Sequence, residues 1–309
     1  MTIVQLEYIV AVDTYKSFVM AAEKCFVTQP TLSMQVQKLE EVLGVKIFDR
    51  TKQPVVATEI GKEIIAQARK TLQESYKINE IINERKDEVS GDLKIGVIPT
   101  IAPFLLPKVI GAFMKEYPKV RLSISELTTE NIVQKLKNGL LDCGILATPL
   151  SENTIIERPV YYENFVCYAS EETAAFTKKT LEFQDLNIDE LWLLNEGHCL
   201  RNQVLNLCKY KKADGQHLDY NTGSIETLIR MVDVNKGMTI LPELSIQDFS
   251  VEQLDKVRYF RTPQPSREVS IVTHTNFIKR KTIDALEKEI LNSIPKSMRS
   301  KSKKSVIAI

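Results

Sequence analysis

Histidine and cysteine are scarce in this sequence, and it has no long apolar run. The 309 residues include three histidines and five cysteines, the latter at positions 25, 143, 167, 199 and 208. An odd number of cysteines without CxxC spacing argues against a secreted disulfide framework and a zinc ribbon, and three scattered histidines argue against another metal site. No segment approaches the roughly 20 apolar residues that a membrane helix needs. We therefore expect no metal, no cofactor and no membrane partner.

Neither sign of charge dominates the chain. Lysine and arginine number 41 against 40 acidic residues, which gives a net charge of +1. This balance gives no global reason to bind nucleic acid, so any charge that contacts DNA must be local. The N-terminal segment lacks the basic start and the small-residue cleavage site of a secretory signal. We expect a cytoplasmic protein, and in that reducing compartment cysteines are usually buried apolar groups or reactive thiols.

The length favours two or three domains. Residues 1 to about 58 have the pattern of short helices with a turn-rich tail, and residues 59–89 predict one helix of about 30 residues, roughly 45 Å long. Apolar side chains recur along this helix at Ile60, Ile64, Ala68, Leu72, Ile78 and Ile82. So narrow a stripe on so long a helix favours pairing with a second chain, and we expect a dimerisation helix.

From residue 90 onward, strand patterns alternate with helix patterns. We expect strands at 93–98, 120–126, 143–147, 165–170, 191–194 and 238–241, and helices at 101–117, 131–138 and 225–235. This order predicts an α/β fold with a parallel sheet covered by helices. We expect a domain over residues 90–295 with two α/β subdomains, at about 90–162 with 267–295 and at about 163–266, and a ligand cleft between them. Residues 296–309 form a basic tail to which no structure is assigned.

Two helices joined by a tight turn are predicted before the long helix. Ser17 is a suitable N-cap for the first, and Thr28 followed by Pro30 begins the second. In the second helix, one apolar stripe must pack against its neighbours; it consists of Leu32, Val36, Leu39 and Leu43. The opposite face presents amides, hydroxyls and a lysine, which are the groups that contact base edges and phosphates in a major groove.

These features predict a DNA-recognition helix. The candidate contact residues are Thr28, Gln29, Pro30, Thr31, Ser33, Met34, Gln37 and Lys38. Residues 48–52 and 55–58 are typical of a β wing, from which Arg50 and Lys52 would contact backbone phosphates. An ordinary helical hairpin with a polar solvent face would give the same local pattern.

The run from Ser17 to Arg50, with its TQPTLS and LE..LGV..F.R patterns, resembles the winged helix-turn-helix of the LysR family of transcription regulators. The resemblance implies a winged helix-turn-helix in residues 1–58, a dimer joined through the linker helix in 59–89, assembly into a tetramer, and inverted-repeat promoter DNA as a partner. It also implies a periplasmic-binding-protein-like regulatory domain after the linker. Gln37 stands where relatives often have a basic residue, a departure that bears on phosphate contacts or base preference.

A second motif surrounds Cys199. An apolar strand pattern passes through Gly197 into a helix pattern that begins at Cys199. The amides and the dipole of a helix start favour a thiolate, and His198 and Arg201 can add donors or positive charge, so we expect a lowered pKa for Cys199. A thiolate attacks peroxide to give a sulfenic acid, which condenses with a second thiol, for which Cys208 is a candidate.

The separation of Cys199 and Cys208 bears on whether they can form a disulfide. Nine residues of straight helix correspond to about 13.5 Å and place the two sulfurs on opposite faces, whereas a disulfide allows only about 4.4 to 6.8 Å between Cα atoms. If these cysteines oxidise to each other, the helix between them must unwind, which would make a two-state switch. Cys208 is equally typical of core packing, because it shares a stripe with Leu200 and Val204. We interpret the remaining cysteines as structural: Cys25, Cys143 and Cys167.

The segment LNEGHCLRNQVLNLC, residues 194–208, is very similar to the peroxide-sensing segment of the hydrogen peroxide sensors of the LysR family, and residues 96–107 and 126–129 extend the similarity. It implies that Cys199 attacks peroxide and that Cys208 resolves the sulfenate. It also implies roles for four further residues: Thr100, Thr129 and His198 as hydrogen-bond partners of peroxide, and Arg267 as the group that stabilises the thiolate and the leaving hydroxide. Without the resemblance, the two threonines would be interpreted as strand-end caps.

The resulting expectation is a homo-oligomeric regulator and not an enzyme. Oxidation by peroxide would remodel the segment between the two cysteines, change promoter contacts and activate antioxidant genes through RNA polymerase, and thiol reductants would restore the dithiol. Asn202 stands where an aspartate is common in the peroxide sensors, a departure that bears on the rate or reversibility of oxidation.

Two other functions are compatible with the sequence. One is a LysR-type regulator that binds a small metabolite in the cleft between the α/β subdomains. The other is a cysteine-dependent enzyme that uses Cys199 and His198, although adjacent residues rarely present a nucleophile and its base correctly.

Overall fold

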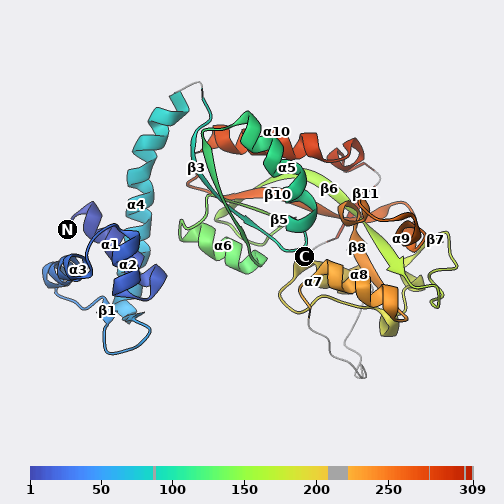
Figure 1. Ribbon diagram of the computed structural model, residues 1–309, viewed down its shortest axis with the longest axis horizontal. Helices are drawn as coiled ribbons and strands as arrows, with labels where there is room; N and C mark the ends of the chain where they lie inside the picture. Colours follow the sequence, from blue (N-terminus) through green and yellow to red (C-terminus); the bar gives the residue numbers. More distant parts are fainter. Residues whose placement is uncertain (86–87, 208–221, 278, 303, 308–309) are drawn as a thin grey trace. The chain divides into compact units, whose positions relative to one another are not determined.

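A computed structural model describes residues 1–85, 88–207, 222–277, 279–302 and 304–307, with only the backbone described for residues 73, 77 and 79–85. The chain divides into two compact units, Met1–Asp87 and Glu88–Ile309 (Figure 1). The first unit has one hydrophobic core and the second has two.

The N-terminal unit is helical with a short hairpin. Its elements are α1 (Ile3–Tyr15), α2 (Phe18–Lys24), α3 (Gln29–Leu43), β1 (Phe48–Asp49), β2 (Val56–Ala57) and α4 (Glu59–Arg85). Ser17 and Thr28 are the N-caps of α2 and α3, as predicted. Each side-chain oxygen accepts a hydrogen bond from the backbone N–H three residues later, that of Met20 and that of Thr31. The antiparallel pair of β1 and β2 is the predicted wing.

The buried face of α3 agrees with the predicted stripe except at its end. Leu32, Val36 and Leu39 are fully buried. Leu43 is 38% exposed, so its predicted place in the stripe is wrong. The reason is that Leu43 is the last helical residue before Gly44, where the chain turns in the left-handed conformation, so that no neighbouring helix covers it.

Helix α4 runs over 27 residues, as the absence of helix breakers predicts. Ala68 and Leu72 are 3% and 5% exposed and pack into the core of their own unit, so the expectation that the whole stripe is kept for a second chain is wrong for these two residues. Ile60 and Ile78 are exposed, and the side chain of Ile82 lies outside the described part of the structure.

The second unit contains a nine-stranded mixed sheet with helices on both faces. Its strands are β3 (Gly91–Val97), β4 (Val120–Glu126), β5 (Cys143–Thr148), β6 (Ile155–Ala169), β7 (Thr180–Leu181), β8 (Met238–Pro242), β9 (Val257–Phe260), β10 (Gln264–His274) and β11 (Lys304–Val306). The order is β4-β3-β5-β10-β6-β9-β7, with β8 paired to β6 and β11 to β10. The expected α/β fold is therefore correct, but the expectation of a parallel sheet is wrong, because β10 runs antiparallel to β5 and β6, and β6 runs antiparallel to β8 and β9.

The helices cover the sheet around these two cores. They are α5 (Ala102–Glu116), α6 (Thr129–Lys137), α7 (Cys199–Leu207), α8 (Ile225–Val234), α9 (Val251–Leu254) and α10 (Arg280–Ser293), with 3-10 turns η1 (Phe183–Asp185), η2 (Ile188–Glu190), η3 (Glu243–Ile246) and η4 (Lys296–Arg299). Helices α5 and α10 lie on one face of the sheet and α6 on the other (Figure 1). Most strands and helices predicted from residue 90 onward are present.

Two further expectations for this unit differ from the structure. The apolar run 191–194 is not a strand, because Leu191 makes only an isolated bridge to Met238. An apolar run can be buried without forming the hydrogen-bond ladder of a strand, so the pattern alone did not distinguish the two. The tail also has structure that the sequence did not reveal. Its strand β11 pairs in parallel with the start of β10, and Ile307 N donates to Ser266 O at 2.9 Å.

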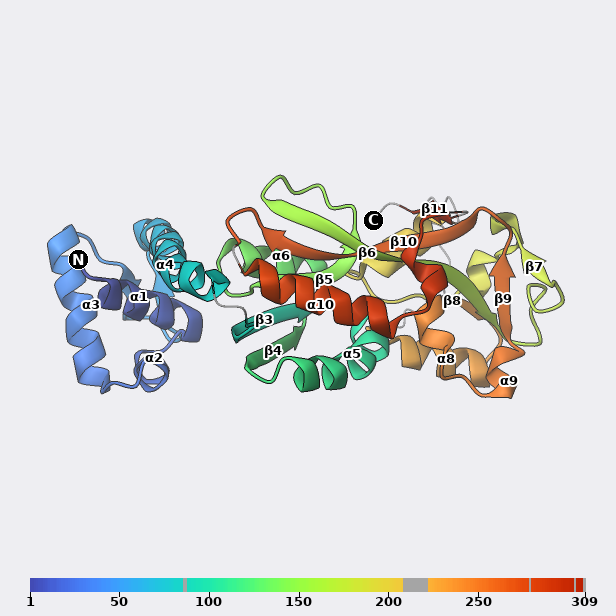
Figure 2. The same ribbon diagram turned by 90° about the horizontal axis from the view of Figure 1, so that it is seen from above.

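The long strands β6 and β10 connect the two cores (Figure 2). Tyr161 on β6 and Val269 on β10 belong to the core beneath α5 and α10, whereas Phe165, further along β6, belongs to the core that contains α7 and α8. Glu163 and Arg267 are cross-strand partners where the two strands pass from one core to the other. The site described below lies at this boundary between the two cores.

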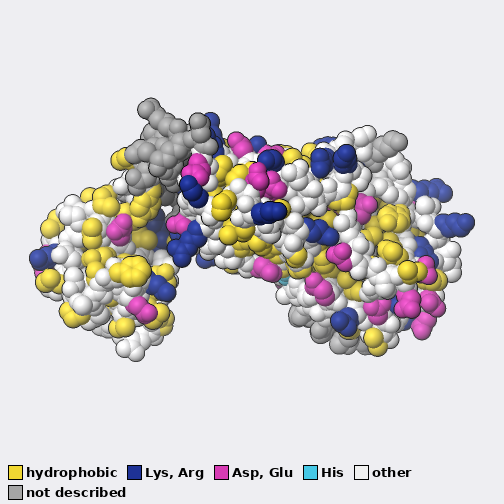
Figure 3. Space-filling view, turned by 45° about the horizontal axis from the view of Figure 1, so that its top comes forward, with side chains coloured by type: hydrophobic (Ala, Val, Ile, Leu, Met, Phe, Trp, Pro, Cys, Tyr) yellow, Lys and Arg dark blue, Asp and Glu magenta, His cyan; other side chains and the backbone are white. Residues whose placement is uncertain are grey.

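Positive and negative side chains are interspersed on the visible face of the second unit (Figure 3), in keeping with the net charge of +1. Among the described helices, none combines the length and the apolar character needed to cross a membrane.

Candidate functional site

Cys199 is the first residue of α7 and is 6% exposed. The apolar side chains that follow it on the buried face of α7, Leu200 and Val204, pack in the core with α8. The Cys199 side chain instead contacts the other core, which lies under α5 and α10. The thiol therefore lies at the boundary between the two cores, beside the part of the β6–β10 pair that passes from one core to the other.

Burial raises the pKa of the Cys199 thiol, so the expectation of a lowered pKa is wrong. The positive charge of Arg267, the Thr129 hydroxyl and the backbone N–H of Leu200 act in the opposite direction, since each stabilises the thiolate. The amides of the helix start are present as predicted, but removal of the thiol from water outweighs them. Sequence spacing could not reveal the depth of burial.

Arg267 is the main cation of this site and is 1% exposed. Its Nη1 donates to Thr100 Oγ1 at 2.9 Å and its Nη2 to Thr100 O at 3.0 Å. Its Nε donates to Glu163 Oε2 at 2.8 Å. The structure thus brings together three of the predicted residues, because Arg267 binds Thr100 and also acts on Cys199.

Glu163 was not found by sequence reasoning. It is fully buried on β6, and its second oxygen, Oε1, accepts a hydrogen bond from Leu244 N at 2.8 Å. One signal was available, because a carboxylate within an apolar strand run must find a buried partner. The sequence alone could not say that this partner is Arg267, about a hundred residues further along the chain.

Two buried hydroxyls near Arg267 and Cys199 have unused hydrogen-bonding capacity. Thr129 Oγ1 and Tyr161 OH are both buried and have no partner at full hydrogen-bond geometry among the described residues, although Thr129 Oγ1 lies close enough to the Cys199 sulfur to favour its thiolate. The N-cap of α6 is Thr128 rather than Thr129, so the alternative interpretation of Thr129 as a cap does not hold. Buried hydroxyls without partners are costly, and a small polar molecule would satisfy them.

His198 is half-buried, and burial lowers the pKa of its imidazole. The lowered pKa favours the neutral ring near pH 7, so of the two contributions expected from His198, a donor or a positive charge, the donor is the one that remains. It packs against Gly223, whose added Cβ would lie 3.1 Å from His198 Nε2. Between described residues, no hydrogen bond joins the imidazole to Thr100, Thr129 or Arg267.

The other cysteines occupy different surroundings. Cys208 lies outside the described residues, so the predicted disulfide is not visible here. Cys143 and Cys167 are fully buried on β5 and β6, as expected for core residues, and Cys25 is half-buried after α2. In the part of the chain that the structure describes, no group of three or more potential ligands could hold a metal ion.

The recognition face of α3 is open to solvent. Its exposed residues include Gln29, Pro30, Thr31, Met34, Gln37 and Lys38. Thr28 also belongs to this face, but its hydroxyl is engaged as the N-cap and lies 2.8 Å from the Thr31 hydroxyl. Gln37 Nε2 donates to Glu41 Oε1 at 3.1 Å, along the same face.

Arg50 is held close to α3 rather than extended into solvent. Its Nη1 donates to Ser33 Oγ at 3.0 Å, its Nη2 lies 3.5 Å from Glu40 Oε2, and its guanidinium stacks 4.6 Å from the Phe18 ring centroid. Two of the predicted DNA contacts, Ser33 and Arg50, thus hold each other. Lys52 is exposed, and its ammonium forms a long ion pair of 3.9 Å with Asp49 Oδ2.

Comparison with protein families matches both units. The LysR substrate binding domain matches residues 86–292, and the bacterial regulatory helix-turn-helix protein of the lysR family matches residues 3–62. The chain belongs to the LysR family of transcription regulators. This is a family of regulators with a DNA-binding domain, not of enzymes, and it accounts for the recognition helix and the wing.

Individual relatives of this LysR regulator are also similar over most of their length. It is 36% identical over 272 residues to the hydrogen peroxide-inducible genes activator of Haemophilus influenzae, covering 88% of this chain and 90% of that one. It is 35% identical over 274 residues to the DNA-binding transcriptional dual regulator OxyR of Escherichia coli K12, with 88% and 89% covered. The structure of the full-length C199D variant of OxyR from Pseudomonas aeruginosa aligns with a TM-score of 0.80 at 34% identity, covering 95% of this chain and 99% of the other.

Proposed function

We propose that this LysR-family regulator senses hydrogen peroxide through Cys199. The observation that carries the proposal is the buried cluster in which Arg267 acts on the Cys199 sulfur, donates to Thr100 and lies near two hydroxyls without partners. A buried cation beside a thiol favours the thiolate and the anion that leaves during its reaction. Similarity to proteins named as hydrogen peroxide-inducible activators supports the same conclusion.

The first step oxidises the thiol. The Cys199 thiolate donates an electron pair to one oxygen of hydrogen peroxide, the S–O bond forms, the O–O bond breaks, and hydroxide leaves and takes up a proton to become water. Arg267 stabilises both the thiolate and the leaving hydroxide. Thr100 Oγ1 accepts from Arg267, which leaves the Thr100 proton to donate to peroxide, and the Thr129 hydroxyl offers a second contact. His198, with its neutral imidazole, completes the proposed hydrogen-bonding set.

The second step forms the disulfide. The Cys208 thiolate attacks the sulfenic sulfur of Cys199, the S–S bond forms, and water leaves after protonation of the displaced hydroxide. Since α7 is helical from Cys199 to Leu207, this bond requires the helix to unwind. Unwinding removes Leu200 and Val204 from their core, which gives the switch two distinct states.

The remaining parts of the proposal concern assembly and output. The domains we propose are 1–58 for DNA binding, 59–89 for dimerisation, 90–295 for sensing, with subdomains divided at about 162 and 267, and 296–309 as the tail. Promoter DNA with inverted repeats, a second copy of the chain in a dimer or tetramer, and RNA polymerase are the partners. Activation of antioxidant genes in the cytoplasm is the output, and thiol reductants reverse it. Gln37 and Asn202 would tune promoter preference and oxidation rate.

Peptide mapping tests the proposal directly. Trypsin separates the two cysteines into residues 180–201 and 202–209, each with a single cysteine. After one equivalent of peroxide without reductant, these peptides should be recovered joined, and the DNA footprint should change. Cys199→Ser should prevent both effects, whereas Cys143→Ala, at another buried thiol, should prevent neither. Unjoined peptides with an unchanged footprint would contradict the proposal, and saturable binding of a metabolite would then favour the alternative LysR function.

A further inference from the structure

The Arg267 guanidinium is fixed on two sides by different residues. Its Nε edge faces Glu163, and its two terminal nitrogens face the hydroxyl and carbonyl of Thr100. A guanidinium is planar, so the carboxylate that holds Nε also decides where the terminal nitrogens point. If Nε were released, the long arginine side chain could adopt other rotamers and lose its direction toward Thr100.

Glu163 is itself immobilised from three directions. It lies opposite Arg267 in the register of β6 and β10, it is fully buried, and its free oxygen accepts from Leu244 N at 2.8 Å. Leu244 belongs to η3, directly after β8, so the carboxylate also connects Arg267 to the part of the sheet next to the second core. Both carboxylate oxygens are thus hydrogen-bonded, which fixes the position of the Glu163 side chain.

We propose that Glu163 is a positioning residue for the reaction of Cys199: it orients Arg267 toward Thr100 and neutralises the Arg267 charge before peroxide arrives. Glu163 acts through Arg267, to which its carboxylate is hydrogen-bonded, and not through a hydrogen bond of its own to Cys199 between described residues. The inference rests on the proposed peroxide chemistry for its purpose, but the arrangement itself can be tested on the thiol without peroxide.

The charges around the pair explain why neutralisation matters. The ionisable groups that face Arg267 are Glu163 and Tyr161 from β6 and Cys199 from α7, and Arg267 is the charged group that acts on Cys199. With Glu163 ionised, Arg267 and Glu163 together carry no net charge, so a thiolate adds one uncompensated negative charge to a dry site. Burial is the largest cause of the raised pKa of Cys199, and we propose that neutralisation of Arg267 by Glu163 favours the thiol form further.

Replacement of the charge gives the decisive variant. Glu163→Gln removes one negative charge, so Arg267 acts on Cys199 without compensation, and the pKa of the thiol should fall. The readout is the pH at which iodoacetamide modifies Cys199 at half its maximal rate, followed on the tryptic peptide 180–201. We expect this midpoint to move by about one pH unit to lower pH. The matched control is Glu268→Gln, because Glu268 is adjacent to Arg267 but its carboxylate accepts from Thr148 Oγ1 at 2.7 Å; its midpoint should not move.

A second variant separates charge from exposure of the thiol. The double variant Glu163→Gln with Arg267→Gln removes both charges, and its midpoint should return at least to the wild-type value. If the double variant keeps the shift of the single variant, the thiol has merely become exposed and the inference is wrong. A single variant whose profile superimposes on wild type would also overturn it.

The orienting role has its own test, and thermal unfolding confirms in each case that the variant is folded. Glu163→Asp keeps the charge but is shorter by one methylene, so the alkylation midpoint should stay within about 0.3 pH units of wild type, while the rate of Cys199 oxidation by peroxide should fall about tenfold. An unchanged oxidation rate would exclude the orienting role. If wild-type Cys199 does not react with peroxide at all, the proposed function fails, whereas the alkylation profiles still decide whether Glu163 controls the thiol.

Discussion

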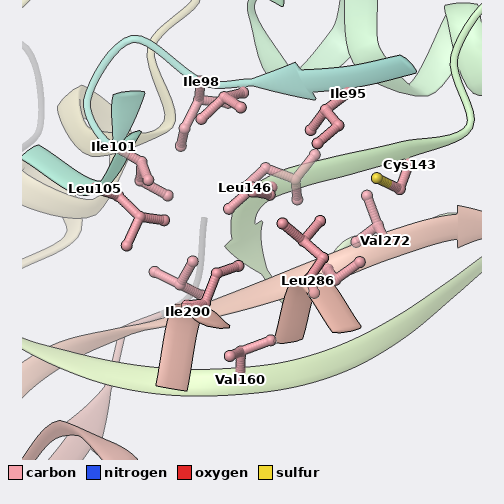
Figure 4. Packing of buried hydrophobic residues seen from close by; sticks show 14 of the residues in the cluster. Ile95, Ile98, Ile101, Leu105, Cys143, Leu146, Val160, Val272, Leu286 and Ile290 are labelled. Carbon is pink, nitrogen blue, oxygen red and sulfur yellow. The ribbon is translucent and has the colours of Figure 1, made fainter. Parts of the chain in front are cut away.

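Cys143 and Cys199 are both buried thiols of the second unit, but their surroundings differ. Cys143 lies on β5 among aliphatic side chains such as Val272 (Figure 4). Burial raises its pKa strongly, and the charge of Asp142 adds to the effect. Cys199 is almost as buried, but Arg267, the Thr129 hydroxyl and backbone N–H groups oppose the rise. A cation opposes the rise at both thiols, since Lys279 acts on Cys143, whereas Cys199 also has the Thr129 hydroxyl and backbone N–H groups beside its sulfur. We expect this difference to make Cys199 reactive and to leave Cys143 unreactive.

The largest effect should come from removal of the buried cation beside Cys199. Arg267→Met leaves Glu163 buried without a partner, so the free energy of unfolding should fall by about 3 to 5 kcal/mol. Urea unfolding measures this loss. The peroxide reaction of Cys199 should be lost, while Cys143 keeps its low reactivity. The double variant with Glu163→Met, an apolar pair, should recover most of the stability but not the reactivity; a single variant that costs less than about 1 kcal/mol would contradict the account.

A smaller effect is expected from the hydroxyl that faces Cys199. Thr129→Val keeps the shape of the side chain but removes a donor, so peroxide oxidation of Cys199 should slow by about tenfold, equivalent to about 1.4 kcal/mol. Stability should not decrease, because the buried hydroxyl has no hydrogen-bond partner among the described residues. Stopped-flow kinetics and thermal unfolding measure the two quantities.

The adjacent threonine is the matched control for Thr129. Thr128→Val removes the N-cap of α6 and should cost about 1 kcal/mol of stability while leaving the oxidation rate of Cys199 unchanged. If both variants slow the reaction equally, the effect of Thr129 arises from the helix start and not from its contact with the thiol.

The smallest effect is a shared pH dependence. Both thiols have a raised pKa in the folded chain, so on going to alkaline pH the unfolded chain loses its protons first and unfolding becomes more favourable. Stability should therefore fall above about pH 8.5, by about 0.4 kcal/mol for each thiol at pH 9. Urea unfolding between pH 7 and 10 measures the slope, which Cys143→Ala should reduce. A stability that rises over this range would show that the thiols are not buried as described.

Local signals in the sequence predicted the elements well, because caps and periodicity act over a few residues. Ser17 and Thr28 begin their helices as expected, and Leu32, Val36 and Leu39 are buried. The site itself depends on contacts between distant residues, which spacing does not encode. Cys199 was a candidate from its place at a helix start, but Thr100, Thr129 and Arg267 were found only because the segments around them resemble known peroxide sensors.

What the sequence missed follows from the same limit. Glu163 is recognised as part of the site only when the register of β6 against β10 places it opposite Arg267. The direction of the pKa shift of Cys199 depends on a burial that local spacing does not specify. The tail strand β11 was not foreseen either, because its partner strand β10 begins about forty residues earlier in the chain.

The most direct test compares the two thiols in one reaction. Native protein is treated with one equivalent of hydrogen peroxide, samples are alkylated over time, and the loss of free thiol is followed separately at Cys199 and Cys143 by mass spectrometry. We predict that Cys199 loses its free thiol while Cys143 keeps its own until the protein is unfolded. Equal rates at the two cysteines, or a Cys199 that stays free, would contradict the claim that the cluster around Arg267 makes one buried thiol reactive.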